Sequence, residues 1–114
     1  MEFIWYPRCS TCIKANKHLL EKHLTFTTRH IVEQTPSLEE LKNWIQIYNQ
    51  GIKPFFNTSG QVYRQLGLKD KINDMSIDEA VKLLASNGML IKRPLLILDD
   101  HIIIGYKKEI YEQL

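Results

Sequence analysis

Two cysteines three positions apart, Cys9 and Cys12, are the side chains in this chain whose types and spacing best suit a chemical role. A cysteine reacts as its thiolate, and two thiols on one helical turn can form a disulfide with little movement of the backbone. The Cys-x-x-Cys spacing therefore predicts a reversible Cys9–Cys12 disulfide. Ser10 and Thr11 lie between the two thiols and belong to the same predicted site.

The two thiols are expected to differ in reactivity. A helical pattern begins at Ser10, so Cys9 lies where free backbone N–H groups and the positive end of the helix dipole favour a thiolate. Arg8 and Lys14 add positive charge nearby and should lower the pKa of Cys9 further. Cys12 lies on the apolar stripe of the helix, so we expect it to be buried and to act as the resolving thiol. The other residues of that stripe are Ala15, Leu19, Leu20 and His23.

Two alternatives for the cysteines stay open. They could be ordinary thiols without a redox role, because free cysteine is among the most buried residue types. They could also hold zinc, but a structural zinc site needs four ligands, usually as two pairs on separate elements. The nearby candidates His18 and His23 would lie on the same helix as Cys12, and one helix cannot surround a metal ion tetrahedrally. The position of the cysteines at a strand-to-helix turn favours the redox role.

A second candidate element is the segment Lys92-Arg93-Pro94-Leu95. Pro94 either simply begins a strand or forms a cis proline beside the dithiol, where a backbone edge could pair with a thiol-bearing partner. Arg93 is either a solvated surface charge or a cation that faces Cys9 and stabilises its thiolate or an oxyanion adduct. The local sequence leaves both pairs of alternatives open.

The elements that would position these residues form a strand–helix–strand unit and a later hairpin. The apolar, aromatic run Glu2–Tyr6 predicts a strand stopped by Pro7, and the β-branched run Thr25–Val32 predicts a second strand. Two strands joined through a helix are expected to pair in parallel. Further along, Leu95–Leu98 and Ile102–Ile104 flank a short polar turn and predict a hairpin.

Helices are predicted for much of the remaining chain. Two capping boxes, Ser37 with Glu40 and Ser76 with Glu79, each indicate a helix start. The first of these helices is expected to end at Gly51. The other predictions are a helix end at Asn87-Gly88, a short helix at Val62–Leu66 and a final helix at Lys107–Leu114.

Length and composition limit the class of protein. A chain of 114 residues with 44% hydrophobic and 25% charged residues is typical of one globular domain. Its net charge of +2 is too small for a protein that binds nucleic acid through phosphates. No apolar run approaches the roughly 20 residues of a membrane span. Met1-Glu2 stands where the basic region of a signal peptide would be, so we expect a cytoplasmic protein without a direct nucleic-acid or membrane partner.

Four segments of the chain form a recognisable set: Tyr6-Pro7-Arg8-Cys9-Ser10-Thr11-Cys12, Tyr63-Arg64-Gln65-Leu66-Gly67-Leu68, Lys92-Arg93-Pro94-Leu95 and Gly105-Tyr106. Together they resemble the glutaredoxin-related arsenate reductase (ArsC) family, which includes the Spx-type redox-responsive regulators of Gram-positive bacteria. The resemblance covers essentially the whole chain. It implies a single domain over residues 1–114 with a thioredoxin-like (glutaredoxin-like) α/β fold, a mixed sheet and helices on both faces. The core would span about residues 1–35 and 91–114, with a helical insert at about 36–90, and the resemblance favours the cis form of Pro94.

The same resemblance assigns roles to individual residues. Cys9 matches the nucleophile of the arsenate reductases, and Arg93 matches the arginine before the family proline. The other arginines of the arsenate-binding site are absent, because Asn57 and Gly105-Tyr106 stand where they would fall. An arsenate ion would lose most of its charge-assisted contacts, so true arsenate reduction is the less favoured activity.

The dithiol, the Arg-Pro pair and the Gly-Tyr segment are more similar to the Spx-type regulators. In those regulators the dithiol is an oxidation switch, and the partner is the α subunit of RNA polymerase. Gly51 matches a glycine at that contact, although glycine is also the usual residue at a helix end.

Three functions are therefore considered. The first is a cytosolic thiol–disulfide oxidoreductase, in which Cys9 attacks and Cys12 resolves the mixed species to a reversible disulfide. It would need no bound cofactor, only an external reductant such as thioredoxin, glutathione or another low-molecular-weight thiol. The second is a redox-switched regulator that binds the RNA polymerase α subunit. The third is a family member whose thiols are inert.

Overall fold

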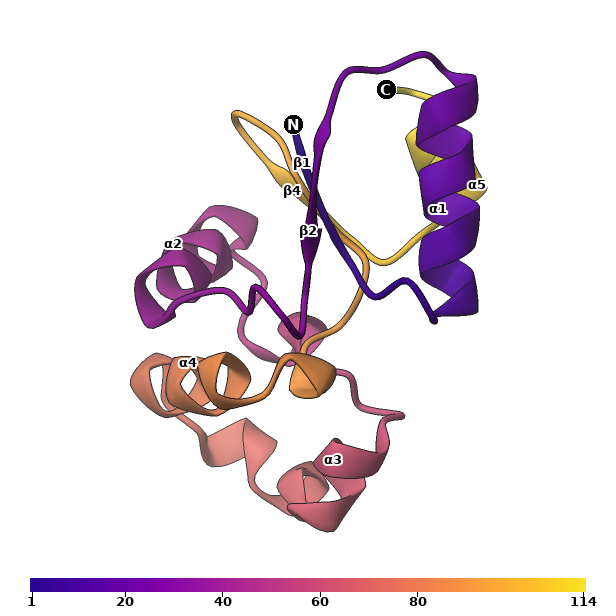
Figure 1. The fold of residues 1–114 in the computed structure, drawn as a ribbon. Helices are drawn as coiled ribbons and strands as arrows, with labels where there is room; N and C mark the ends of the chain where they lie inside the picture. Colours follow the sequence, from indigo (N-terminus) through magenta and orange to yellow (C-terminus); the bar gives the residue numbers. More distant parts are fainter. The chain divides into compact units, whose positions relative to one another are not determined.

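The structure, a computed structural model, describes residues 1–114 and divides the chain into two compact units (Figure 1). The first unit comprises Met1–His30 and Arg93–Leu114, and the second comprises Ile31–Lys92. The first unit is thus built from the two ends of the chain. All the residues proposed for the dithiol site belong to this first unit.

A four-stranded mixed sheet organises the first unit, with the strand order β2-β1-β3-β4. The central strand β1 (Glu2–Trp5) pairs in parallel with β2 (Thr27–His30), and α1 (Ser10–Glu21) connects the two. On its other side β1 pairs antiparallel with β3 (Leu95–Ile97), which continues antiparallel to β4 (Ile102–Ile104). This arrangement confirms the predicted fold class, a thioredoxin-like mixed sheet in an α/β chain with a helical insertion.

The second strand is shorter than the predicted Thr25–Val32. Its register with β1 runs from Glu2↔Thr27 to Trp5↔His30, so it uses every residue of β1. A strand continues only where its backbone N–H and C=O groups find hydrogen-bond partners on a neighbouring strand. β1 ends at Trp5, shortly before the turn at Pro7, so it offers β2 no partners beyond that point. The length of β1 therefore sets the length of β2.

Helices α1 and α5 (Lys108–Tyr111) pack together on one face of this sheet (Figure 1). Leu20, which we predicted on the buried stripe of α1, is 58% exposed, because successive residues on a helix are turned by about 100°. His23 lies beyond the helix end, in a left-handed conformation with φ 57°. The stripe is thus narrower than the sequence pattern suggested. The fully buried residues of the cluster are Phe3, Leu96, Ala15, Leu19 and Tyr111.

The second unit is helical, and both predicted capping boxes are present in it. The Ser37 hydroxyl accepts from the Glu40 N–H at 3.1 Å, and the Ser76 hydroxyl accepts from the Glu79 N–H at the same distance. In each box the glutamate carboxylate accepts a hydrogen bond from the backbone N–H of the serine. The helices are α2 (Leu38–Tyr48), α3 (Gln61–Gln65) and α4 (Ile77–Ser86), with 3-10 turns at Lys53–Phe55, Leu68–Asp70, Ile72–Asp74 and Gly88–Leu90.

The end of α2 differs from the prediction. The helix stops at Tyr48, where Asn49 takes the left-handed conformation with φ 54°. Asparagine can adopt this conformation because its short polar side chain is tolerated there. Gly51, the predicted end, also has a positive φ of 79°, but it lies in the exposed loop that follows.

Candidate dithiol site

The connection between β1 and α1 places both thiols on the first turn of the helix. Cys9 is the N-cap residue, with extended backbone angles of φ −87° and ψ 121°. Its N–H donates to the Tyr6 carbonyl at 2.9 Å, and its own carbonyl accepts from the Ile13 N–H at 3.0 Å. Cys12 follows three residues later, inside the first turn. The predicted position of the cysteines at a strand-to-helix turn is confirmed.

The two thiols differ in their access to solvent. Both cysteines are free of a disulfide; Cys9 is half-buried and Cys12 is fully buried. A reagent in solution can therefore reach Cys9, whereas the Cys12 side chain is closed to solvent.

The surroundings of Cys9 favour its thiolate. Partial burial alone would raise the pKa of Cys9, but hydrogen bonding to the backbone and thiol of Cys12 and to Arg93 lowers it, as does the positive charge of Arg93. The net effect is a pKa below the usual value of a thiol. At a given pH near neutrality, Cys9 is thus ionised more often than an ordinary cysteine.

The pKa of Cys12 is shifted in the opposite direction. Burial raises the pKa of Cys12 to about 12, and the neighbouring charge of Cys9 adds to that rise. The positive charge of Arg93 offsets it only in part. Cys12 therefore remains a thiol under conditions in which Cys9 can be a thiolate.

Arg93 is held beside the dithiol by an aromatic ring. Its guanidinium carbon lies 5.4 Å from the centroid of the Tyr6 ring, a distance typical of cation–π contacts. The peptide bond between Arg93 and Pro94 is cis, as the family resemblance implied. The carbonyl of Pro94, which is itself buried, accepts from the Gly105 N–H at 2.8 Å. The β3–β4 hairpin thus anchors the segment that carries Arg93.

The other predicted members of the site lie at its surface. Arg8, Ser10 and Thr11 are all exposed. Arg93, rather than Arg8 or Lys14, is the cation whose charge lowers the pKa of Cys9. Water and salt screen an exposed charge, whereas Arg93 is partly buried against Tyr6. Arg93 is thus the cation with the clearest effect on Cys9, and the contribution of Arg8 and Lys14 stays a prediction.

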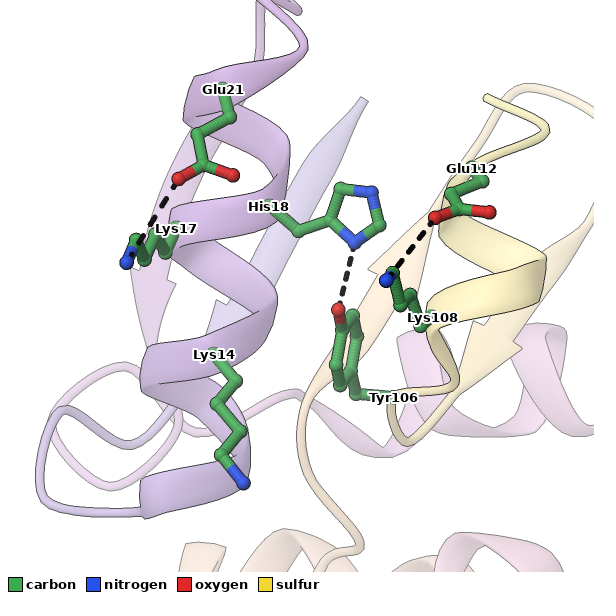
Figure 2. Close-up of a pocket in the computed structure, with 7 residues that line it drawn as sticks. All are labelled: Lys14, Lys17, His18, Glu21, Tyr106, Lys108 and Glu112. Carbon is green, nitrogen blue, oxygen red and sulfur yellow. Dashed lines mark hydrogen bonds and ion pairs between the residues drawn. The ribbon is translucent and has the colours of Figure 1, made fainter.

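A ring cluster between α1 and the end of the chain was not anticipated from the sequence. His18 reaches from α1 to Tyr106, and their Nδ1 and hydroxyl atoms share a hydrogen bond of 2.7 Å, at a cleft of about 360 Å³ (Figure 2). The Tyr111 ring lies 4.8 Å from the Tyr106 ring and 5.8 Å from the His18 ring. No local pattern could reveal this cluster, because its members come from α1 and from the last segment of the chain.

Two residues that the resemblance singled out belong to the second unit. The side chain of Asn57 donates to the Met89 carbonyl at 3.5 Å and accepts from the Ser59 hydroxyl at the same distance. Gly51 is exposed, and nothing lies within 4 Å of the place where a Cβ would stand.

The structure contains no group of three or more His, Cys, Asp or Glu side chains arranged to hold a metal ion. None of its helices combines the length and apolar character of a membrane span.

Known proteins are similar to this chain over almost its entire length. The sequence model of the ArsC family matches residues 4–114. YusI of Bacillus subtilis (strain 168) is 48% identical over 99% of this chain and 96% of its own length. The regulatory protein MgsR of the same organism is 35% identical over 93% of this chain and 82% of its own length. The solved structure of an ArsC family related protein from Bacteroides fragilis has a TM-score of 0.92 and 46% identity, covering 98% of this chain and 94% of that one.

Proposed function

Because the chain belongs to the ArsC family, we propose that it is a thiol–disulfide redox protein with Cys9 as the nucleophile and Cys12 as the resolving thiol. The observation that carries this proposal is that the pKa values of two neighbouring thiols are shifted in opposite directions. The pKa of Cys9 is lowered, while the pKa of Cys12 is raised to about 12. Disulfide exchange needs a thiolate for the first attack and a second thiol that reacts afterwards, and these two pKa values suit those two steps.

The chemistry balances without a bound cofactor. The Cys9 thiolate attacks one sulfur of a substrate disulfide, so a Cys9 mixed disulfide forms and the first substrate thiolate leaves. The Cys12 sulfur then attacks Cys9, the Cys9–Cys12 disulfide forms, and the second substrate thiolate leaves and takes up the proton given up by Cys12. The substrate gains two electrons and the protein loses two. Thioredoxin, glutathione or another low-molecular-weight thiol would return them.

Arg93 has a defined part in this scheme. Its positive charge favours the Cys9 thiolate before the attack, and it loses that partner once Cys9 is bound in a disulfide. Arg93 therefore stabilises the reduced, reactive form of the protein more than the oxidised form.

An equilibrium titration tests the proposal. The protein is equilibrated with buffers of defined thiol–disulfide ratio, alkylated, and weighed by mass spectrometry. We expect both alkylation sites to disappear together at a reduction potential between roughly −120 and −300 mV. Cys9→Ser and Cys12→Ser are the controls, since each keeps one thiol and cannot form the internal disulfide. If both thiols of the unmodified protein stay open to alkylation under oxidising conditions, the self-contained dithiol mechanism is wrong.

A second candidate function is supported by the similarity to the regulatory protein MgsR. In that case the dithiol would be a switch, and the partner would be the α subunit of RNA polymerase, as the resemblance to Spx-type regulators implies. A pull-down of purified α subunit with the oxidised and the reduced protein separates the two functions. Association in one redox state supports the switch. Absence of association in both states, together with turnover of disulfides by a thioredoxin or glutathione system, supports the oxidoreductase.

Arsenate reduction is the activity that these residues support least. Arg93 is the one arginine present from the family's arsenate site, since Asn57 and Gly105-Tyr106 stand in the other places. We expect arsenate to leave the reduced dithiol unoxidised in the alkylation assay described above. Loss of both alkylation sites upon addition of arsenate alone would restore this activity as the leading candidate.

A further inference from the structure

The hydroxyl of Tyr111 is buried without a hydrogen-bond partner. The side chain is fully buried in the cluster between α1 and the sheet, yet its oxygen neither donates nor accepts a hydrogen bond. A buried hydroxyl without a partner opposes folding, and phenylalanine would fill the same space without that cost. An unpartnered group of this kind calls for an explanation in the function of the protein.

The position of Tyr111 links it to the resolving thiol. Its ring packs with Ala15 and Leu19, which share with Cys12 the buried stripe of α1. Burial is the main reason that the pKa of Tyr111 is raised, and negative charge on Cys12 raises it further. The hydroxyl therefore keeps its proton when Cys12 is ionised, so it can act as a dipole or hydrogen-bond donor but not as a base.

The groups that favour charge on Cys12 in the second step, a hydrogen bond to the Tyr6 backbone and the positive charge of Arg93, offset only part of the effect of burial. To attack the mixed disulfide, the sulfur of Cys12 must develop negative charge in a buried place, where burial opposes ionisation. Bound in the mixed disulfide, Cys9 carries no charge and cannot accept the proton. A polar group that faces the developing thiolate would act strongly there, because electrostatic interactions are stronger in a low-dielectric interior than in water.

We propose that the Tyr111 hydroxyl stabilises the Cys12 thiolate as that thiolate attacks the Cys9 mixed disulfide. The inference rests on the proposed function, because it concerns the second step of the same exchange. No bond to Tyr111 forms or breaks: the Cys12 proton ends on the departing substrate thiolate, and the tyrosine keeps its own proton. The unpartnered hydroxyl of the reduced protein is, in this view, a donor whose acceptor exists only during the reaction.

Stopped-flow reaction with 5,5′-dithiobis(2-nitrobenzoate) tests the inference on the whole chain. Attack by Cys9 releases the first coloured thiolate, and resolution by Cys12 releases the second, so the two steps appear as two phases of one trace. In Tyr111→Phe we expect an unchanged first phase and a second phase slowed about tenfold near neutral pH, the effect of losing one hydrogen bond to a charged group. The difference should shrink as the pH rises toward the pKa of Cys12.

A matched control separates this role from a structural one. Tyr106→Phe removes the hydrogen bond to His18 from the same ring cluster but leaves the Tyr111 hydroxyl in place, so both of its phases should keep the wild-type rates. The reduction potential of Tyr111→Phe should also stay at the wild-type value, because Cys12 is protonated in the reduced protein and bonded in the oxidised one. Equal second-phase rates in Tyr111→Phe and wild type would overturn the inference alone. A wild-type trace without a second phase would overturn the proposed function and the inference with it.

Discussion

Arg93 lies over the ring of Tyr6, with 5.4 Å between its guanidinium carbon and the ring centroid, although the two residues come from opposite ends of the chain. The ring of Tyr6 also meets the His30 ring edge-to-face at a centroid distance of 5.6 Å. Tyr6 thus joins the strand that leads to Cys9, the end of β2 and the segment before Pro94. The cation that lowers the pKa of Cys9 is thus positioned by the same turn that leads to Cys9.

Removing the charge of Arg93 should make Cys9 less reactive. The guanidinium lowers the pKa of Cys9, so Arg93→Ala is expected to raise that pKa and to slow alkylation of Cys9 at pH 7 several-fold. The measurement is the rate of iodoacetamide labelling of Cys9 against pH, read by peptide mass. At high pH, where Cys9 is ionised in both proteins, the two rates should converge.

Arg8→Ala is the matched control for this prediction. Arg8 is also a cation next to Cys9 in sequence, but it is exposed, whereas Arg93 is the cation whose charge lowers the pKa of Cys9. Its removal should leave the labelling profile nearly unchanged. An equal slowing in Arg8→Ala and Arg93→Ala would show that general positive charge, rather than the position of Arg93, sets the reactivity of Cys9.

The stability of the protein is expected to fall at alkaline pH because of Cys12. Its folded-state pKa is raised, so folding favours the protonated thiol. That contribution is fully present below the ordinary thiol pKa of 9.0 and is lost as the pH rises toward about 12. Over this window the free energy of unfolding should decrease by at most about 1.4 kcal/mol per pH unit from this group. Urea unfolding under a phosphine reductant at a series of pH values measures the slope.

The two single-cysteine variants identify the group responsible. Cys12→Ala should show a shallower decline between these pH values, with the remainder due in part to Tyr111, whose pKa burial also raises. Cys9→Ala should keep most of the wild-type decline, because burial is the main cause of the Cys12 shift. A slope that is unaffected by Cys12→Ala would mean that Cys12 ionises in the folded protein as easily as in the unfolded chain.

Local signals in the sequence were enough to locate the dithiol. The strand-to-helix turn at Cys9, the burial of Cys12 and both capping boxes depend on residues within four positions of each other, and all are present in the structure. The sequence left open whether Arg93 faces Cys9 or is a solvated surface charge. The pairing of β1 with β3 brings Arg93 to Cys9, and this pairing joins segments far apart in the chain. The pairing of His18 with Tyr106 and the unpartnered hydroxyl of Tyr111 depend on packing between α1 and the chain end, which no spacing rule describes.

The capping box at the start of α4 should contribute measurably to stability. The Ser76 hydroxyl accepts from the Glu79 N–H at 3.1 Å, and Ser76→Ala removes that acceptor. We expect a loss of about 1 kcal/mol in the free energy of unfolding, the usual value for an N-cap serine. Ser76→Asp keeps an acceptor at the same position and favours the positive end of the helix dipole, so it should retain the wild-type value. Equal losses in both variants, measured by urea unfolding, would contradict a capping role.

Gly88 is expected to tolerate no side chain, because the backbone of another segment fills the space beside it. A Cβ at this position would overlap the carbonyl oxygen of Ile31, and it would also lie only 3.0 Å from the Val32 Cα. The overlapping atoms belong to the backbone, so no side-chain rotation can relieve the clash. We expect Gly88→Ala to lower the free energy of unfolding by about 1–3 kcal/mol, the cost typical of overpacking.

Gly67→Ala is the comparison that isolates this steric cause. Gly67 has a φ of 64° and nothing within 4 Å of its Cβ position, so alanine there meets only the strain of the left-handed conformation, about 1 kcal/mol. Urea unfolding of both variants should therefore show the larger loss at Gly88, even though its φ is not in the left-handed region. A wild-type free energy of unfolding in Gly88→Ala would mean that Ile31 and Val32 can move away from α4 and its following turn without cost, and the close approach of these segments would then be no constraint on the second unit.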